Sequence, residues 1–155
     1  MMTWKIHLKF DPLLILRSTK NKAILHFIKK DLLDEEVKSN KLLWKLPEVG
    51  KILKKQNSDG SWKYPSSKKD LRTQENYNQL ETYRQLGFLI EKYAFNNLHP
   101  AIRNASDYLF SFQTKEGDFR GIYGTQYSPN YSAGIMELLI KSGYDKDPRI
   151  EKGLK

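Results

Sequence analysis

Residues 100–119, PAIRNASDYLFSFQTKEGDF, decide the fold, because residues 47–62, PEVGKILKKQNSDGSW, repeat their second half. The separation from proline to glutamine is 9 residues in the earlier copy and 13 in the later one. The difference of four is about one helical turn, so the glutamine keeps its place on the helix face. The residues that recur, each displaced by 57, are Gln56, Gly60 and Trp62, matched by Gln113, Gly117 and Phe119.

A second sequence repeat occurs at the starts of two predicted helices. Pro100, Ile102 and Ala105 recur 48 residues later as Pro148, Ile150 and Gly153. A long pattern of apolar residues at helical spacing precedes each of the two prolines. The repeating unit is therefore a helix, a short link and a proline-started helix, with a further copy beginning near the last residue.

The repeated glutamine has a physical role at a helix end. Its amide carries two donors and an acceptor, which can reach the unpaired carbonyls of its own helix or the free N–H groups of a neighbour. Asp59 and Gly60 supply the turn with positive φ that ends the helix. Trp62, or Phe119 in the later copy, can then cover the amide and exclude water. We interpret both stretches as joints between neighbouring helices and not as catalytic groups.

These residues resemble a known motif. Ala105, Tyr108, Leu109, Gln113, Gly117 and Phe119 are spaced as in the QW motif of the squalene cyclase and prenyltransferase repeat family. Gln56, Asp59, Gly60 and Trp62 resemble its second half, and Lys152-Gly153 resembles the start of another copy. Phe119 replaces the usual tryptophan, and Glu48 and Lys51 replace the small and aromatic residues upstream of Gln56.

The resemblance implies an all-α protein made of helical-hairpin repeats of an α/α toroid, the terpenoid cyclase and protein prenyltransferase fold. It covers roughly residues 42–155, and a complete toroid has more hairpins than this stretch holds. We therefore expect an incomplete toroid, either a fragment, a truncated product or a chain that completes its core by self-association. The expected domains are a basic helical extension, 1–40, and a partial repeat domain, 41–155.

Helical periodicity predicts about six or seven helices, and no segment alternates convincingly as a β-strand does. Phe119–Asn130 and Lys63–Thr73 are expected to be loops because they are rich in glycine, proline and polar residues. Gly143 is expected to end the fifth helix. The predicted helices are Asn21–Leu33, Leu42–Gln56, Tyr77–Phe95, Pro100–Phe112, Ser132–Ser142 and one that opens at Pro148.

Charge is concentrated in the first third of the chain. Residues 1–55 hold 13 Lys/Arg against 6 Asp/Glu, a net charge of +7, out of +9 for the 155 residues. Such a segment can contact nucleic acid or an anionic membrane surface, or it can be a solvated lysine-rich face. We favour the solvated face and rank nucleic acid last, because no recognition motif accompanies the lysines. The lack of cysteine fits a cytoplasmic protein, with peripheral membrane contact as the alternative.

Catalytic signatures of the family are missing from this sequence. The Asp-x-Asp-Asp acid motif does not occur, and Asp145-Lys146-Asp147 reads as a link with Asp147 capping the next helix. His7, His26 and His99 lack metal-ligand spacing, so we expect no metal and no cofactor, and His99 is expected to cap or pack. The glycines of residues 117–124 lack the strand and lysine of a nucleotide-binding loop.

The remaining candidate site is the tyrosine-rich loop, residues 117–134. Its aromatic residues could rim a cavity and stabilise a cation through their ring faces. They could equally pack the loop over the helix ends, which we favour. The candidate rim residues are Arg120, Tyr123, Gln126, Tyr127 and Tyr131.

Two functional hypotheses follow from the sequence. In the first, the protein acts on or binds an isoprenoid-type or other apolar small molecule, as the family resemblance implies. In the second, it is a non-catalytic helical-repeat module that binds a protein or lipid surface. Whether it is an enzyme stays open, because no Asp-x-Asp-Asp or zinc-ligand motif is found.

Overall fold

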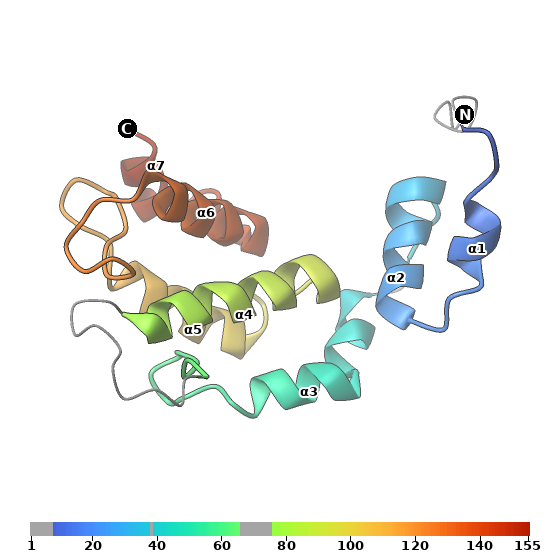
Figure 1. The fold of residues 1–155 in the computed structure, drawn as a ribbon, viewed down its shortest axis with the longest axis horizontal. Helices are drawn as coiled ribbons and strands as arrows, with labels where there is room; N and C mark the ends of the chain where they lie inside the picture. Colours follow the sequence, from blue (N-terminus) through green and yellow to red (C-terminus); the bar gives the residue numbers. More distant parts are fainter. Residues whose placement is uncertain (1–7, 38, 66–75) are drawn as a thin grey trace.

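The computed structural model describes residues 8–37, 39–65 and 76–155, and within them the chain is all-α (Figure 1). These residues form no β-strand, only the isolated bridges Gln56–Trp62, Gln113–Phe119 and Gly121–Gly124. The α-helices are α1 (Leu13–Arg17), α2 (Lys22–Phe27), α3 (Pro47–Leu53), α4 (Tyr77–Tyr93), α5 (Pro100–Phe110), α6 (Pro129–Leu139) and α7 (Pro148–Gly153). The other helical segments are the π-helix η2 (Ile28–Leu32), the 3₁₀ helix η3 (Asn40–Lys45) and the π-helix η4 (Ile140–Tyr144).

The helix starts follow the proline and cap signals. Pro47, Pro100 and Pro148 each occupy the first turn of a helix, as predicted, since a proline has no N–H to leave unpaired there. The side chain of Asp147 accepts the N–H of Arg149, which confirms its capping role. Gly143 has φ +99°, a left-handed conformation that breaks the helical path at the predicted end.

Three predicted boundaries were wrong. Asn21–Leu33 is not one α-helix, because it widens into η2 after Phe27. In Leu42–Gln56 the main helical part begins at Pro47, as predicted, but it ends at Leu53, and the residues before it form η3, separated from α3 by the extended backbone of Leu46. The loop predicted over Phe119–Asn130 ends early, since α6 begins at Pro129. The loop predicted over 63–73 extends outside the described residues, and so does His7.

Helix α4 lies at the centre of the main core. It packs against α3, α5 and α6, and α6 packs against α7 (Figure 1). The core includes the repeat residues Ile102 and Ile150, both fully buried. Three buried positions of α4 are polar: Gln79, Glu81 and Thr82. Gln79 Nε2 donates to the carbonyl of Arg120 at 2.9 Å, and Thr82 accepts the N–H of Trp62.

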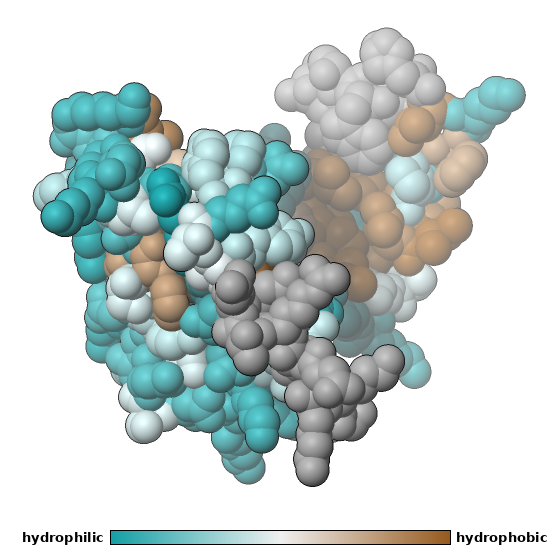
Figure 2. Space-filling view, turned by 60° about the vertical axis from the view of Figure 1, so that its left-hand side comes forward, coloured by the Kyte–Doolittle hydropathy of each residue, from teal (hydrophilic) through white to brown (hydrophobic). Residues whose placement is uncertain are grey.

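The N-terminal residues form a smaller cluster of their own. Leu13 of α1, Ile28 of η2 and Leu33 pack together, apart from the main core. Helix α2 contacts α4, and Figure 1 places α1 and α2 at the end of the molecule remote from α7. Figure 2 places apolar surface on this N-terminal part. None of the described helices combines the length and hydropathy needed to cross a bilayer.

Candidate functional site

The first joint connects α3 to α5 through Gln56. Its Nε2 donates to the carbonyl of Gly60, at 3.0 Å, and to the carbonyl of Ala101 in the first turn of α5, at 2.9 Å. The glutamine therefore donates to a carbonyl of the turn and to a carbonyl of the neighbouring helix. The predicted partners, which were carbonyls of its own helix or free N–H groups of a neighbour, were wrong. Asp59 accepts the hydroxyl and N–H of Ser61, which lowers the pKa of its carboxyl group.

The second joint connects α5 to α7 with the same bonds. Gln113 Nε2 donates to the carbonyl of Gly117, at 2.9 Å, and to the carbonyl of Arg149, at 2.7 Å. Arg149 follows Pro148 as Ala101 follows Pro100, so the partners of the two glutamines keep the 48-residue displacement. The two sequence copies thus correspond to two copies of one three-dimensional joint.

Both joints need small residues at their closest approach. Gly60 has φ +89°, and a Cβ built on it would overlap the carbonyl oxygen of Asn104 in α5. Gly117 has φ +99°, and its Cβ would lie 2.5 Å from the carbonyl oxygen of Lys152 in α7. A Cβ on Gly153 would in turn lie 2.9 Å from the Gly117 carbonyl oxygen. The recurring glycines therefore let each turn lie directly on the next helix.

The aromatic residue of each joint is buried and tied to a helix of the layer that α4 and α6 form. Trp62 and Phe119 are both 2% exposed. The N–H of Trp62 donates to Thr82 Oγ1 of α4 at 3.0 Å, and the N–H of Phe119 donates to Ser132 Oγ of α6 at 2.8 Å. Each joint therefore fastens three helices, which explains why both hydroxyl residues are buried.

The tyrosines of residues 117–134 differ in exposure and in place, since Tyr123 and Tyr127 lie in the loop and Tyr131 lies in α6. Tyr123 and Tyr127 are about half exposed, at 48% and 54%. The ring of Tyr131 contacts those of Tyr83 and Tyr123, and burial, followed by the Tyr123 hydroxyl, raises the pKa of Tyr131. Arg120 turns back to Asp118, its Nε 2.7 Å from Oδ2, and this hydrogen bond lowers the pKa of Asp118.

Gln126, the fifth candidate rim residue, is exposed. Its backbone N–H bonds to the carbonyl of Tyr123 within the loop. None of the five candidate rim residues lines the cavities described below, and Tyr131 comes nearest through its contact with Tyr83. A role of this loop at a cavity rim stays a prediction.

His99 caps α5, as predicted. Its Nδ1 accepts the N–H of Ala101 at 3.1 Å, and its ring packs against Trp44 and Phe95. Burial, followed by the charge of Arg103, lowers the pKa of His99 below its ordinary value of 6.5. Within the described ranges, no group of three or more His, Cys, Asp or Glu side chains could hold a metal ion.

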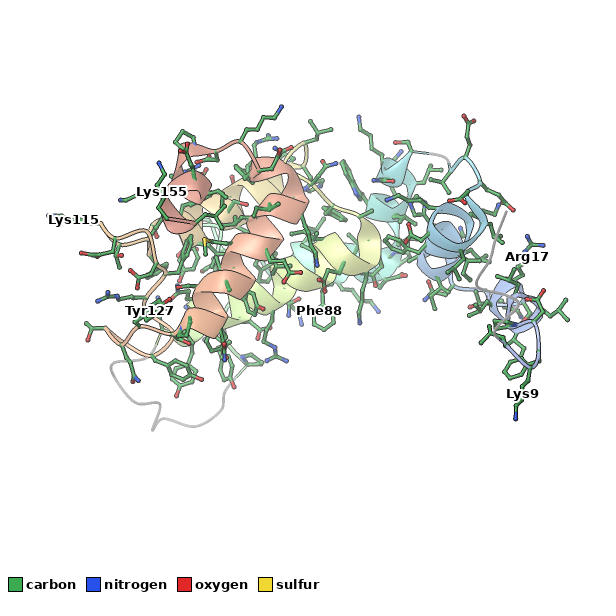
Figure 3. The ribbon with its side chains drawn as sticks, turned by 90° about the horizontal axis from the view of Figure 1, so that it is seen from above. Lys9, Arg17, Phe88, Lys115, Tyr127 and Lys155 are labelled. Atoms are coloured by element: carbon green, nitrogen blue, oxygen red, sulfur yellow. The ribbon has the colours of Figure 1, made fainter. Side chains whose placement is uncertain are left out.

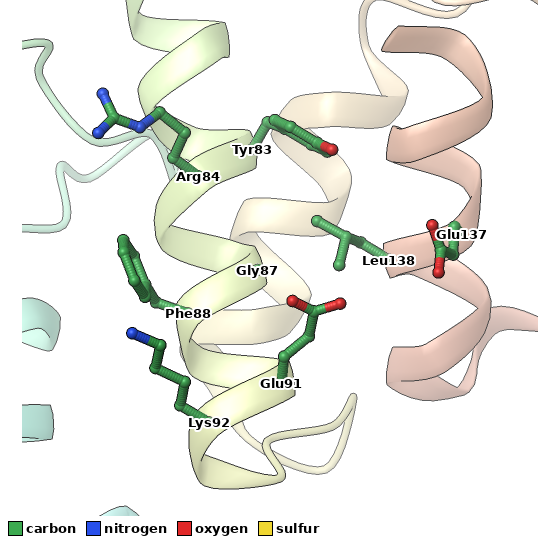
Figure 4. Close-up of a pocket in the computed structure, with 8 residues that line it drawn as sticks. All are labelled: Tyr83, Arg84, Gly87, Phe88, Glu91, Lys92, Glu137 and Leu138. Carbon is green, nitrogen blue, oxygen red and sulfur yellow. The ribbon is translucent and has the colours of Figure 1, made fainter. Parts of the chain in front are cut away.

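The structure brings together a different set of residues along α4. A cavity of about 280 Å³ lies between α4 and α6 (Figure 4). In Figure 4, Tyr83, Glu91 and Leu138 point into the space between the two helices, while Phe88 and Lys92 lie beside each other on the exposed side of α4. The lining residues are Tyr83, Arg84, Gly87, Phe88, Glu91, Lys92, Glu137 and Leu138.

Two further cavities continue this space towards the N-terminal helices. One of about 550 Å³ lies between α2, η2 and the last turns of α4, and one of about 530 Å³ lies between η2, η3 and the end of α4. Glu91 lines all three cavities, and Lys92 lines the first two. We call the three together the α4 groove. The apolar residues that α2 and η2 contribute to its 550 Å³ part are Ala23, Ile24, Phe27, Ile28 and Leu32.

The middle of the α4 groove is polar. Lys141 Nζ lies 2.7 Å from Glu137 and 3.0 Å from Glu91, and these two carboxylates raise the pKa of the lysine. Lys92 Nζ lies 4.3 Å from the centre of the Phe88 ring, a cation–π contact. The groove can therefore accept an apolar chain beside α2 and offers donors and acceptors for a polar group near Glu91.

Sequence reasoning missed the residues of the α4 groove. The helical period places Phe88, Glu91 and Lys92 on the polar face of α4, where solvent exposure is the ordinary expectation. The one available signal was Phe88, an aromatic residue on that face.

A fourth cavity, of about 330 Å³, lies under α2 and includes His26, whose pKa is lowered by burial and then by Lys30.

Comparison with known proteins gives no relative for this chain: no protein-family model, no curated protein and no solved structure matches it. The resemblance to the QW-motif family therefore stays a resemblance of sequence residues alone.

Proposed function

We propose that the protein is a helical-hairpin repeat module of the α/α-toroid type that binds an elongated, isoprenoid-type apolar molecule in the α4 groove. In this arrangement α4 and α6 are inner helices, and α3, α5 and α7 are outer helices joined in series by Gln56 and Gln113. The equivalence of the two joints supports the repeat architecture. Within that equivalence, the acceptor carbonyls of Ala101 and Arg149 keep the 48-residue displacement of the proline series.

One observation supports the proposed class of ligand. Three cavities meet at Glu91, and the widest has a wall of aliphatic and aromatic side chains from α2 and η2. Ligand sites are typically concave, largely apolar and supplied with a few polar groups that fix orientation. An extended hydrocarbon chain fits such a wall, and a terminal hydroxyl group can donate to Glu91 and accept from Lys92. An isoprenoid alcohol has both parts.

The test is to measure the binding of farnesol and geranylgeraniol to the full chain by isothermal titration calorimetry. We expect saturable binding that Phe88→Asp weakens at least tenfold, equivalent to about 1.4 kcal/mol. A carboxylate at residue 88 would place a charge at the wall of the 280 Å³ cavity and would remove the ring that Lys92 covers. Phe88 is 38% exposed, so the substitution is not expected to disturb the core.

Leu98→Asp is the matched control, because Leu98 is an exposed apolar residue that lines none of the four cavities. Its affinity for both alcohols should equal that of the unmodified protein. Absence of saturable binding, or an equal loss in the two variants, would count against the α4 groove as the ligand site.

A further inference from the structure

The N-terminal part of the molecule presents apolar side chains that pack against nothing described above. Helix α1 buries only Leu13 in the small cluster with Ile28 and Leu33. Its other side and the residues before it are exposed, and Figure 2 places apolar residues over this part of the surface. We call this set the N-terminal apolar face: Leu8 (48% exposed), Phe10 (69%), Leu14 (79%) and Ile15 (71%).

Basic residues accompany this face along the chain. Residues 8–22 hold Lys9, Arg17, Lys20 and Lys22 against the single acidic residue Asp11, a net charge of +3. Figure 3 places Lys9 and Arg17 at the outer end of the molecule, to either side of α1. Arg17 forms an ion pair with Glu35 at 3.4 Å, but both side chains are largely exposed, so water screens this pairing.

The shape and charge of this face select its partner. None of the four cavities described above is lined by Leu8, Phe10, Leu14 or Ile15, so a partner helix would find no groove among them. A second copy of the chain would bring the same positive charge against it, and like charges facing each other repel. Protruding apolar side chains with lysine and arginine beside them are what an interfacial segment presents to anionic lipids.

We propose that the N-terminal apolar face docks onto an anionic membrane surface. Phe10, Leu14 and Ile15 enter the boundary between headgroups and acyl chains, and the accompanying lysines contact the lipid phosphate and carboxylate groups. This docking is independent of ligand binding in the α4 groove, because the two use different residues.

Co-sedimentation of the full chain with lipid vesicles tests the proposal. We expect at least tenfold stronger binding to phosphatidylcholine vesicles containing about a third phosphatidylserine than to pure phosphatidylcholine, and weaker binding at high salt. Leu14→Asp and Phe10→Asp should each reduce binding to the mixed vesicles at least tenfold. Both residues are exposed, and far-ultraviolet circular dichroism should confirm that the variants keep their helices.

Two controls separate this proposal from its alternatives. Leu98→Asp and Phe88→Asp should bind the mixed vesicles as the unmodified protein does, so a failure of ligand binding and a failure of docking are distinguishable. Equal binding to the two vesicle types would overturn the proposal. So would undiminished binding by the Leu14 and Phe10 variants, or a concentration-dependent dimer on size-exclusion chromatography that Leu14→Asp abolishes.

Discussion

At the scale of single residues, the two joints depend on an aromatic side chain that is almost completely buried. Trp62 donates its indole N–H to the carbonyl of Ile52 at 2.9 Å and packs in the main core. Trp62→Ala should lower the free energy of unfolding by about 3–5 kcal/mol, because it leaves a cavity and an unpaired carbonyl. Chemical denaturation measures this loss.

Leu98→Ala is the comparison for Trp62→Ala, since Leu98 is 67% exposed. Surface substitutions of this kind usually change stability by no more than about 0.5 kcal/mol. A loss of similar size at Trp62 would mean that the joint between α3 and α5 is not formed.

Two glycines should respond in opposite directions to the same substitution. Gly60→Ala should destabilise the protein by about 2–4 kcal/mol, because it combines a left-handed backbone with a collision against the Asn104 carbonyl. Gly50 lies inside α3 with nothing within 4 Å of a built Cβ. Gly50→Ala should therefore stabilise the protein by up to about 1 kcal/mol, the helix propensity difference. Thermal unfolding measures the melting temperatures of the two variants. A melting temperature above that of the parent for both variants would contradict this prediction.

At the scale of elements, the cap of α5 should make stability depend on pH. His99 Nδ1 must be unprotonated to accept the Ala101 N–H, and burial lowers the pKa of His99. In the unfolded chain, the His99 imidazole takes up a proton near pH 6.5. In the folded chain, the same imidazole stays neutral down to a lower pH. The contribution of His99 is therefore complete above about pH 6.5 and is lost as the pH falls below this value towards the folded pKa.

His99→Asn isolates this effect, because asparagine caps helices well and does not titrate. We expect its free energy of unfolding to fall less than that of the parent between pH 7.5 and pH 5.5 in urea denaturation. His26 has a lowered pKa as well and gives both proteins a common background. His99→Ala should lose about 1 kcal/mol at neutral pH, the usual contribution of a cap. The parent and His99→Asn would have parallel pH profiles if His99 did not titrate in this way.

The elements themselves were largely predictable where the sequence marks their ends. Pro47, Pro100 and Pro148 start helices as expected, because proline is suited to a first turn. Pro129 gives the same signal for α6, yet the glycines and tyrosines before it extended the predicted loop too far. The π-helical turns at Ile28 and Ile140 were not predictable, because a change from four- to five-residue bonding leaves the apolar spacing nearly unaltered.

The candidate site could not be predicted, for a different reason. The α4 groove collects side chains from α2, α4 and α6, which lie far apart in the sequence. Helical periodicity, applied to each helix alone, predicts that Glu91, Lys92 and Glu137 are exposed to solvent. The packing of α6 and of α2 against α4 turns this face into a concave surface. The joints were predictable because each is formed by a short stretch of chain that occurs twice.

At the scale of the whole molecule, ligand binding and membrane docking are proposed for two different surfaces. The α4 groove runs along α4, between α6 on one side and the N-terminal helices on the other, and the N-terminal apolar face lies on α1 and the residues before it. A protein that docks on a bilayer and holds an apolar ligand nearby can exchange that ligand with the membrane. The two binding reactions are tested by separate variants, Phe88→Asp for the groove and Leu14→Asp for the face.

The most direct test of the central claim is photo-crosslinking of the full chain with a diazirine-bearing farnesol analogue, followed by mass spectrometry of the labelled peptides. We predict labels in two segments, residues 84–93 of α4 and residues 23–32 of α2 and η2. Excess farnesol should compete with them, and Phe88→Asp should reduce them at least tenfold. Labels concentrated in residues 117–134, the tyrosine-rich loop and the start of α6, or labels that farnesol does not displace, would contradict the assignment of the α4 groove as the ligand site.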